Sequence, residues 1–466
     1  MEIDMDRRRT ALVVASAGYF FVLLDVTIVN VALARIGSDL GASRSELQWV
    51  VDGYALILAA FMLGAGDLAD RLGSRRLFLA GLALFGLASA ACATAPSAAV
   101  LVAARVAQGL GAAAILPTSL AVVNQLYPDP DERPRAIGIW AGIGSSALVL
   151  GPVLGGVLVG PLGWRAIFAL NVPLVALSLL GGWRLLPSGP AARGERADLP
   201  GQLLGTLALA ALVFALIDGG HAGFGTTPAI ATAVVALGAL AAFVAVELRR
   251  RRPLLDLRWF SRPEFSGANA GAGLMNLGTL GALFALSLFL QDARGLSPLE
   301  TGLNLVPLAA PLALLALFAG RLVARIGPRL PAGLGLLACG AGYLALSGLE
   351  GSIEGPAGWA LLALSGTGMG FATPALVAGA TEALGRDRAG IASAVNNTSR
   401  QVGGAVGVAL IGGFTTVNAS LLASGLALAL GAATALALMA RKKSGYRDFP
   451  QRGGEKICMQ AGERRR

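Results

Sequence analysis

Charged residues are scarce in this 466-residue chain: Asp, Glu, Lys and Arg make up 14% of it, whereas 55% of the residues are hydrophobic. A soluble protein of this length needs a charged surface on all sides, so the composition excludes a soluble globular fold. Apolar stretches of about 20 residues recur along the chain, each long enough to span a bilayer as a helix. Alternating strand patterns are absent, and we therefore predict an all-α polytopic membrane protein.

Cysteine and histidine are also rare. Cys92, Cys339 and Cys458 show no paired spacing, and the single histidine, His221, lies in a predicted connection. We therefore expect no disulfide and no metal site. The chain has no G-x-x-x-x-G-K-[ST] motif, which argues against ATP as the direct energy source, and no constellation of catalytic side chains. We expect no cofactor and no enzymatic activity.

The net charge of +10 raises the possibility of a nucleic-acid partner, but the position of the charges argues against it. Most cations lie in short segments between apolar stretches, where they set topology. The basic connections alternate with connections that are nearly free of cations. An even number of helices then places both termini on the cytoplasmic side of a bacterial inner (plasma) membrane. We place fourteen helices near residues 10–34, 46–69, 76–95, 98–120, 134–160, 164–186, 199–219, 227–247, 265–290, 299–324, 330–349, 356–380, 389–416 and 419–440.

The two halves of the chain repeat each other. The set Gly66, Asp70, Arg71 and Gly73 recurs at one constant offset as Gly320, Ala324, Arg325 and Gly327. Likewise, Gly109, Gly111 and Pro117 recur as Gly366, Gly368 and Pro374. Parallel duplication of this kind is typical of rocker-type secondary transporters, which bind substrate between the halves. We predict a six-helix bundle over 1–190, two extra central helices with basic linkers over 191–260, a second six-helix bundle over 261–441, and a mobile cytoplasmic tail over 442–466.

We single out three charged side chains inside predicted spans of the first half of the chain. Asp25 lies mid-span, where a charge costs at least about 2.5–3.5 kcal/mol. It must face a cavity, find a partner or be protonated, and these are the properties of a proton site. Permanent pairing with Arg105, or a hydrogen bond to Asn30, would instead make it a structural residue. Arg105 lies too deep to set topology and can stabilise a deprotonated Asp25 or Asp52. Asp52 is nearer the outer end, so it could equally be a vestibule charge.

Two further segments combine glycine with polar or bending residues. The connection GDLADRLGSRR predicts an ion-pair latch at the cytoplasmic mouth, although an ordinary polar turn has a similar composition. We assign to this cytoplasmic gate the residues Gly66, Asp67, Asp70, Arg71, Gly73, Arg75 and Arg76. The helix near 134–160 presents a smooth, bendable surface, which can serve tight packing, a rocking contact that limits proton leak, or both. Its motif residues are Gly144, Gly151, Pro152, Gly155 and Gly156.

Polar residues elsewhere in the spans predict a substrate cavity. We assign to this cavity Asn30, Gln108, Asn396, Asn397 and Arg400. Arg400 could hold a polar network with Asn396, Asn397 and Gln401, or could simply stabilise packing. The second half has no acid in mid-helix, which favours neutral or monocationic substrates over dications.

These motifs resemble those of a known family. GDLADRLGSRR is similar to the G-x-L-A-D-R-x-G-R-K signature of the major facilitator superfamily. LDVTIVNVAL, residues 24–33, resembles the first-helix signature of its fourteen-helix drug:proton antiporters, with Ala34 where a Pro is usual. Further segments resemble other motifs of that family: LVAARVAQGLGAA (101–113), GSSALVLGPVLGG (144–156), GWRAIFALNVP (163–173) and SRQVGGAVGVA (399–409). The resemblance implies a major-facilitator fold, a coupling role for Arg105 and a monomeric protein.

The function expected from these features is proton-coupled efflux, by alternating access, of small amphipathic organic compounds or drugs. The partners would be a small-molecule substrate, protons and the lipid bilayer, with the proton gradient as energy source. A dedicated exporter of one endogenous metabolite or antibiotic is the alternative within this class. A membrane receptor or lipid-modifying enzyme is a remote alternative, because the chain has neither a sizeable soluble domain nor a recognisable catalytic site.

Overall fold

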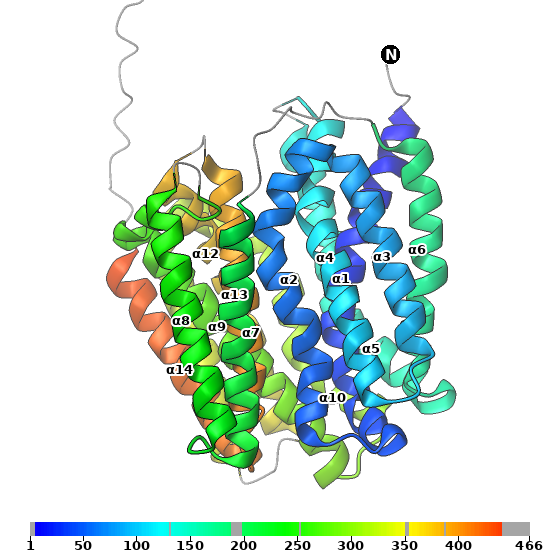
Figure 1. The fold of residues 1–466 in the computed structure, drawn as a ribbon, viewed down its shortest axis with the longest axis vertical. Helices are drawn as coiled ribbons and strands as arrows, with labels where there is room; N and C mark the ends of the chain where they lie inside the picture. The colour runs from blue at the N-terminus through cyan, green and yellow to red at the C-terminus, as the bar shows by residue number, and fades with distance from the viewer. Residues whose placement is uncertain are drawn as a thin grey trace, which may run out of the picture.

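The structure, a computed structural model, describes residues 5–129, 132–187, 198–250, 253–349, 354–385 and 388–439. The predicted tail and most of the first linker lie outside these residues. A 3-10 helix (Leu257–Ser261) and a π-helical turn (Phe289–Ala293) flank α9. The described long α-helices are α1 (Met5–Leu40), α2 (Arg44–Leu72), α3 (Ser74–Ala93), α4 (Ala98–Leu126), α5 (Arg133–Leu162), α6 (Arg165–Leu185), α7 (Leu199–Ala222), α8 (Thr227–Arg249), α9 (Pro263–Leu288), α10 (Pro298–Ile326), α11 (Arg329–Ser347), α12 (Pro356–Leu384), α13 (Ala389–Ile411) and α14 (Val417–Leu438) (Figure 1).

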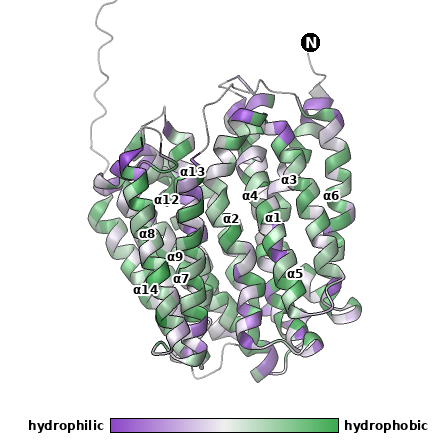
Figure 2. Ribbon diagram, viewed as in Figure 1, coloured by the Kyte–Doolittle hydropathy of each residue, from purple (hydrophilic) through white to green (hydrophobic). Residues whose placement is uncertain are grey.

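Hydrophobic residues dominate the middle of the molecule and hydrophilic ones gather toward its two ends (Figure 2). Within the described residues, 12 helices are long and apolar enough to cross a membrane. Helix α13 carries several polar side chains and falls short of that criterion. The prediction of an all-α multi-pass membrane protein is therefore confirmed. The count of fourteen spans stays a prediction.

The helices form two bundles that lie side by side (Figure 1). The first consists of α1–α6 and has its own apolar core around Phe78, Phe85 and Ile115. The second consists of α9–α14, with a separate core around Phe265, Leu336 and Tyr343. Between the bundles in sequence, α7 and α8 form a hairpin. This is the predicted arrangement of two six-helix bundles and two extra helices, although the exact domain boundaries stay a prediction.

Corresponding glycines pack in the same way in the two bundles. A Cβ atom on Gly109 would meet the backbone of Tyr54 in α2, and one on its counterpart Gly366 would meet the backbone of Leu308 in α10. The pair Gly73 and Gly327 both adopt positive φ angles, 89° and 82°, at the turns after α2 and α10. Only glycine enters such turns without strain. The internal repeat read from sequence thus corresponds to repeated helix contacts.

The molecule has two ends along the direction of its helices, and we name each end by the residues that lie there. The N-terminal face holds Met5 and Leu72, and the distal face holds Leu40 and Arg44. An apolar cluster joins the two bundles toward the distal face, with Ile28 and Leu33 of α1 meeting Phe284 and Leu288 of α9. Direct contacts of α2 with α13 and of α5 with α10 reinforce this closure.

Helix α7 connects the two bundles laterally. It packs against both α2 and α13, and its Leu209 and Val213 share an apolar cluster with Leu56 of α2 and Ala405 of α13. The buried Gln202 of α7 donates a hydrogen bond of 2.7 Å to the carbonyl oxygen of Ala60 in α2. Helix α8 lies outside α7, and only 17% of its apolar membrane-spanning segment is buried. Of the two extra helices, α7 therefore contacts both bundles while α8 mainly covers α7.

The close approach of α3 to α4 can be tested with single methyl groups. In Gly111→Ala the added Cβ meets the backbone of Gly81 and Phe85, so the two helices must part. We expect this variant to lose about 1–3 kcal/mol of unfolding free energy, seen as a lower thermal midpoint of the purified protein in detergent. The matched control is Gly138→Ala in α5, where the new Cβ meets nothing within 4 Å. Equal midpoints for the two variants would contradict the contact described here.

Candidate functional site

The first bundle contains a buried ion pair at its centre. A guanidinium nitrogen of Arg105 in α4 donates a short hydrogen bond to Oδ2 of Asp25 in α1, and both side chains are 1% exposed or less. Gln108, one turn along α4, donates a bond of 2.8 Å to the other carboxylate oxygen of Asp25. The same amide lies 3.0 Å from the hydroxyl oxygen of Ser89 in α3. Both oxygens of the carboxylate therefore accept hydrogen bonds.

Aromatic and backbone groups hold the guanidinium in place. Its Nε donates to the carbonyl oxygen of Val50 in α2 at 2.9 Å, and its Cζ lies 4.3 Å from the ring centre of Tyr54. The phenol of Tyr54 in turn donates to the carbonyl of Val22 in α1. Gly109 allows α4 to approach α2 this closely. Such cation–π and charge-assisted contacts strengthen as water is excluded, so they hold Arg105 of α4 against α1 and α2.

Asp52 is the second buried acid, and it differs from Asp25. Its side chain is 0% exposed, and neither carboxylate oxygen has a hydrogen-bond partner among the described residues. It shares a stripe of α2 with Gln48 and Arg44, at intervals of four residues, and this stripe contacts α13. Gln48 donates to the carbonyls of Val408 and Ala409, at 2.9 and 3.2 Å. Arg44 donates to the carbonyl of Gly412 at 2.9 Å, at the C-terminal end of α13, where a cation is favourable.

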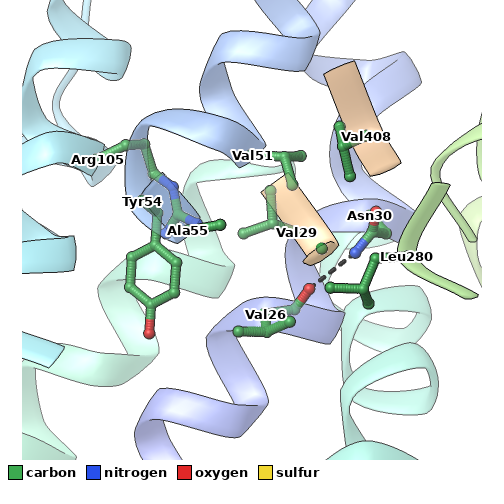
Figure 3. A pocket seen from close by; sticks show the side chains of 10 residues that line it. Val26, Val29, Asn30, Val51, Tyr54, Ala55, Arg105, Leu280 and Val408 are labelled. Atoms are coloured by element: carbon green, nitrogen blue, oxygen red, sulfur yellow. Dashed lines mark hydrogen bonds between the residues drawn. The ribbon is translucent and has the colours of Figure 1, made fainter. Parts of the chain in front are cut away.

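A small pocket lies between the two bundles beside the ion pair (Figure 3). Its cavity volume is about 20 Å³, room for about one water molecule. Arg105 and Tyr54 lie on one side of it, and Leu280 of α9 and Val408 of α13 lie on the other. Asn30 lines it but donates to the carbonyl of Val26 at 2.8 Å rather than to Asp25. A drug-sized ligand can therefore enter this pocket only when the bundles separate.

The glycine-rich helix α5 contacts both bundles. A Cβ atom on Gly144, Gly151 or Gly155 would meet α1, at Tyr19, Thr27 and Ile28 respectively. One on Gly156 would instead meet Leu299 of α10, and Gly302 of α10 approaches the carbonyl of Pro152. The motif residues thus bring α5 against α1 on one side and against the opposite bundle on the other.

The predicted cytoplasmic gate is described only in part. Gly73 ends α2, its N–H donating to the carbonyl of Ala69, and Arg75 donates a short bond to the carbonyl of Trp183 in α6. Arg71 also has an interaction partner, and Arg76 lies in the first turn of α3. Gly66 has open space where a Cβ would be, so no close approach depends on it in this conformation. The side chains of Asp67 and Asp70 lie outside the described set, and the predicted latch stays a prediction.

The polar residues of α13 divide between two surroundings. Asn396 is buried and donates to the carbonyl of Ala268 in α9 at 3.2 Å, whereas Asn397 lies 3.7 Å from the sulfur of Met62 in α2. Arg400 forms no hydrogen bond to either residue and lies within electrostatic range of Tyr19 in α1. The structure therefore does not show the network of Arg400 with Asn396, Asn397 and Gln401 that the sequence suggested as one possibility.

Several residues of the site could not be singled out from the sequence. Ser89 and Tyr54 support the ion pair, and Gln48 contacts α13, yet serine and tyrosine within a span are common. Gln48 did carry a signal, because it lies one helical turn before Asp52. Trp140 stacks on Tyr19, with ring centres 4.2 Å apart and planes inclined by 12°. Aromatic residues in spans usually serve packing, so the sequence did not single out Trp140 or Tyr19.

Comparison with known proteins agrees with this architecture. The family model described as Major Facilitator Superfamily matches residues 15–408, and the chain belongs to this superfamily. It is 36% identical over 434 residues to the methylenomycin A resistance protein of Streptomyces coelicolor, covering 91% of each chain. It is 40% identical over 403 residues to the multidrug resistance protein Stp of Mycobacterium tuberculosis, covering 86% of this chain and 74% of that protein. The resemblance read from the sequence motifs is confirmed.

Solved structures show the same fold. A bacterial homologue of the human lysosomal transporter Spinster, solved in an inward-facing and unoccupied conformation, superposes with a TM-score of 0.67. The two chains are 17% identical, and the match covers 93% of this chain and 97% of that one.

The ion pair can be tested for energetic coupling without any transport assay. Arg105→Gln leaves a buried carboxylate without its counter-ion, and Asp25→Asn leaves a buried guanidinium without its own. We expect each single variant to lose about 3–5 kcal/mol of stability, and the double variant to lose clearly less than the sum. Thermal midpoints of the purified proteins in detergent give the comparison. Additive losses would show that the two charges do not interact as described.

Proposed function

We propose that the protein is a proton-coupled exporter of small amphipathic organic compounds, working by alternating access and without enzymatic activity or a bound cofactor. The observation that carries this proposal is the position of the Asp25–Arg105 pair: it is fully buried, yet Arg105 also lines the pocket between the bundles. A change of charge on Asp25 therefore acts at the surface along which the bundles must move. Membership of a transporter superfamily and relatives named for drug resistance support export.

The coupling step follows from the cost of an unpaired buried charge. Protonation of Asp25 removes the counter-ion of Arg105, whose guanidinium is enclosed by Tyr54 and Phe168. Breaking a buried pair in this way costs about 3–5 kcal/mol. A free energy of this size is enough to shift a two-state equilibrium from one conformation to the other. Protonation would thus favour a conformation in which Arg105 gains water or substrate as a partner.

Asp52 is the second proton site in this proposal. A carboxylate with no donor near either oxygen is costly in the interior, so in this closed conformation it is best accommodated as the neutral acid. It lies on the stripe of α2 that contacts α13, one turn from Gln48. Opening the distal face would expose Asp52 and let it release its proton.

The distribution of cations supports the proposed orientation in a bacterial inner membrane, with the N-terminal face in the cytoplasm. Three of the distal-face cations have specific partners: Arg44 caps α13, Arg165 binds Asp39, and Arg294 binds Glu354. Their presence on the outer side therefore has a structural reason. The described cations at or near the N-terminal face are more numerous: Arg7, Arg8, Arg9, Arg71, Arg75, Arg76, Arg133, Arg135, Arg184, Arg249, Arg250, Arg258, Arg262, Arg321, Arg325, Arg329 and Arg388.

A dedicated exporter of one antibiotic or metabolite is the second candidate. The methylenomycin A resistance protein is named for a single antibiotic, and its match covers 91% of both chains. The protein Stp, by contrast, is named for resistance to several drugs. Both candidates use the same coupling site and differ in the breadth of substrates accepted between the bundles.

Gradient-driven flux in everted membrane vesicles tests the proposal. Ethidium, a neutral coumarin and fluorescein, which differ in charge, are offered at an acid-inside pH gradient. We expect uptake of at least one dye, its loss by at least tenfold in Asp25→Asn, and partial loss in Asp52→Asn. Asp6→Asn, at the exposed start of the same helix, is the matched control and should behave as wild type. Undiminished gradient-driven uptake in Asp25→Asn would remove Asp25 from the coupling mechanism.

The distal closure predicts a second effect. Gln48→Leu removes both hydrogen bonds to the end of α13, so the outward-open state should become more populated. Spin labels are attached at Ser45→Cys and Phe414→Cys in a background where Cys458 is replaced. A larger outward-open population appears as a longer component in the distribution of distances between the two labels. Cys92 and Cys339 are buried and can remain. Arg35→Gln, which removes an exposed cation of the same face, should leave the distances unchanged. An identical distribution in Gln48→Leu and wild type would contradict the role of this contact.

A further inference from the structure

Arg400 is a cation in mid-membrane without a counter-ion among the described side chains. It lies eleven residues from either end of α13 (Ala389–Ile411). Among the described side chains it has no ion pair, and its Nε has no hydrogen-bond partner. A charged side chain at this depth normally faces a cavity or a partner, so an unpaired one marks a functional site.

The helix positions of Asp67 and Asp70 in α2 lie at a different level of the bundle from Arg400. Asn397 is level with Met62 of α2, and the two helices run in opposite directions. Arg400 lies three residues farther from the N-terminal face, whereas Asp67 lies five residues closer to it. At 1.5 Å per residue, the two are about 12 Å apart along the bundle. Asp70 is farther still.

Arg400 adjoins the pocket between the bundles. It shares one stripe of α13 with Gly404 and Val408, at intervals of four residues, and both of these line the pocket. Arg400 is therefore one helical turn, about 5.4 Å, from the pocket on its N-terminal side. The other charges nearby are accounted for: Arg105 is neutralised by Asp25, and Asp52 is buried.

An aromatic platform lies near Arg400 in the opposite bundle. Tyr19 of α1 lies within electrostatic range of the guanidinium and is stacked on Trp140 of α5. The indole N–H of Trp140 donates to the hydroxyl of Ser119 at 3.3 Å, which fixes the orientation of its ring. Gly144 leaves room for the Tyr19 ring against α5. Like Arg400, Tyr19 lies on the N-terminal side of the pocket, two turns from Val26.

We propose that Arg400, Tyr19 and Trp140 form a subsite for flat aromatic organic acids, in which Arg400 pairs with a carboxylate or phenolate and the aromatic ring of the substrate contacts the Tyr19–Trp140 stack. A planar guanidinium matches a carboxylate through two parallel hydrogen bonds. A cationic substrate would be repelled by Arg400. The structure thus favours anionic substrates over the neutral or monocationic ones suggested by the lack of acids in the second half. This inference rests on the proposed export function, because the subsite opens only when the bundles part.

Equilibrium binding to the protein in nanodiscs tests the subsite without requiring proton coupling. Three ligands with one ring system are titrated by calorimetry: 2-naphthoate, 2-naphthamide and 2-naphthylmethylammonium. We expect wild type to bind naphthoate at least tenfold more tightly than the amide and to bind the ammonium most weakly. Arg400→Gln should lose the tenfold preference, and Arg400→Lys should retain part of it. Arg249→Gln, at the exposed end of α8, is the matched control and should bind as wild type.

Several outcomes would overturn the inference. These are tightest binding of the ammonium, absence of binding by all three ligands, or unchanged naphthoate affinity in a folded Arg400→Gln. If Arg400→Gln does not fold, Arg400→Lys and Tyr19→Leu carry the test, and both must weaken naphthoate more than naphthamide. Arg400-dependent binding without gradient-driven flux would reject the export proposal and keep the subsite. Gradient-driven export with binding indifferent to charge would reject the subsite and keep the export proposal.

Discussion

The ion pair between Asp25 and Arg105 is the interaction on which the first bundle depends. Two charges removed from water in the membrane interior are tolerated only if each is compensated almost completely. Here α1 supplies the carboxylate, α4 the guanidinium and an amide, α3 a hydroxyl, and α2 a carbonyl and an aromatic ring. Four helices are therefore positioned by one charge pair. The glycine at 109 is needed because these groups meet only if α4 closely approaches α2.

The same constraint explains where polarity lies in the rest of the structure. The helices α2 and α13 contact each other between the bundles, where Arg44 and Gln48 of α2 donate hydrogen bonds to carbonyl oxygens of α13. Helix α7 covers both of them on one side with an apolar surface, so α2 and α13 are shielded from lipid there. The helices that face outward carry little polarity; α8 is the most apolar of the spans. Polar residues are thus concentrated along the surface between the two bundles.

Much of this architecture could be predicted from the sequence, and for identifiable reasons. The length of the apolar stretches indicated the helices. The recurrence of Gly73 as Gly327 indicated the duplication, because a turn with positive φ requires glycine in both halves. Asp25 and Arg105 were recognisable because a charge in mid-span is costly wherever it occurs. Ser89 was not, because a serine in a helix satisfies itself, as it does here by donating to the carbonyl of Phe85 at 2.7 Å. The proximity of Tyr19 to Arg400 depends on how α1 and α13 are placed relative to each other, which residue patterns do not encode.

The central claim is that Asp25 changes its protonation state as the transporter moves between conformations. Infrared difference spectroscopy of the protein in lipid, recorded between acid and neutral pH, measures the carboxylic acid band of buried groups directly. The account predicts a band that appears at acid pH, is lost in Asp25→Asn and changes when a transported substrate is added. A spectrum in which Asp25→Asn removes no band would show that Asp25 stays ionised beside Arg105 throughout, and that the pair is a structural element rather than the coupling site.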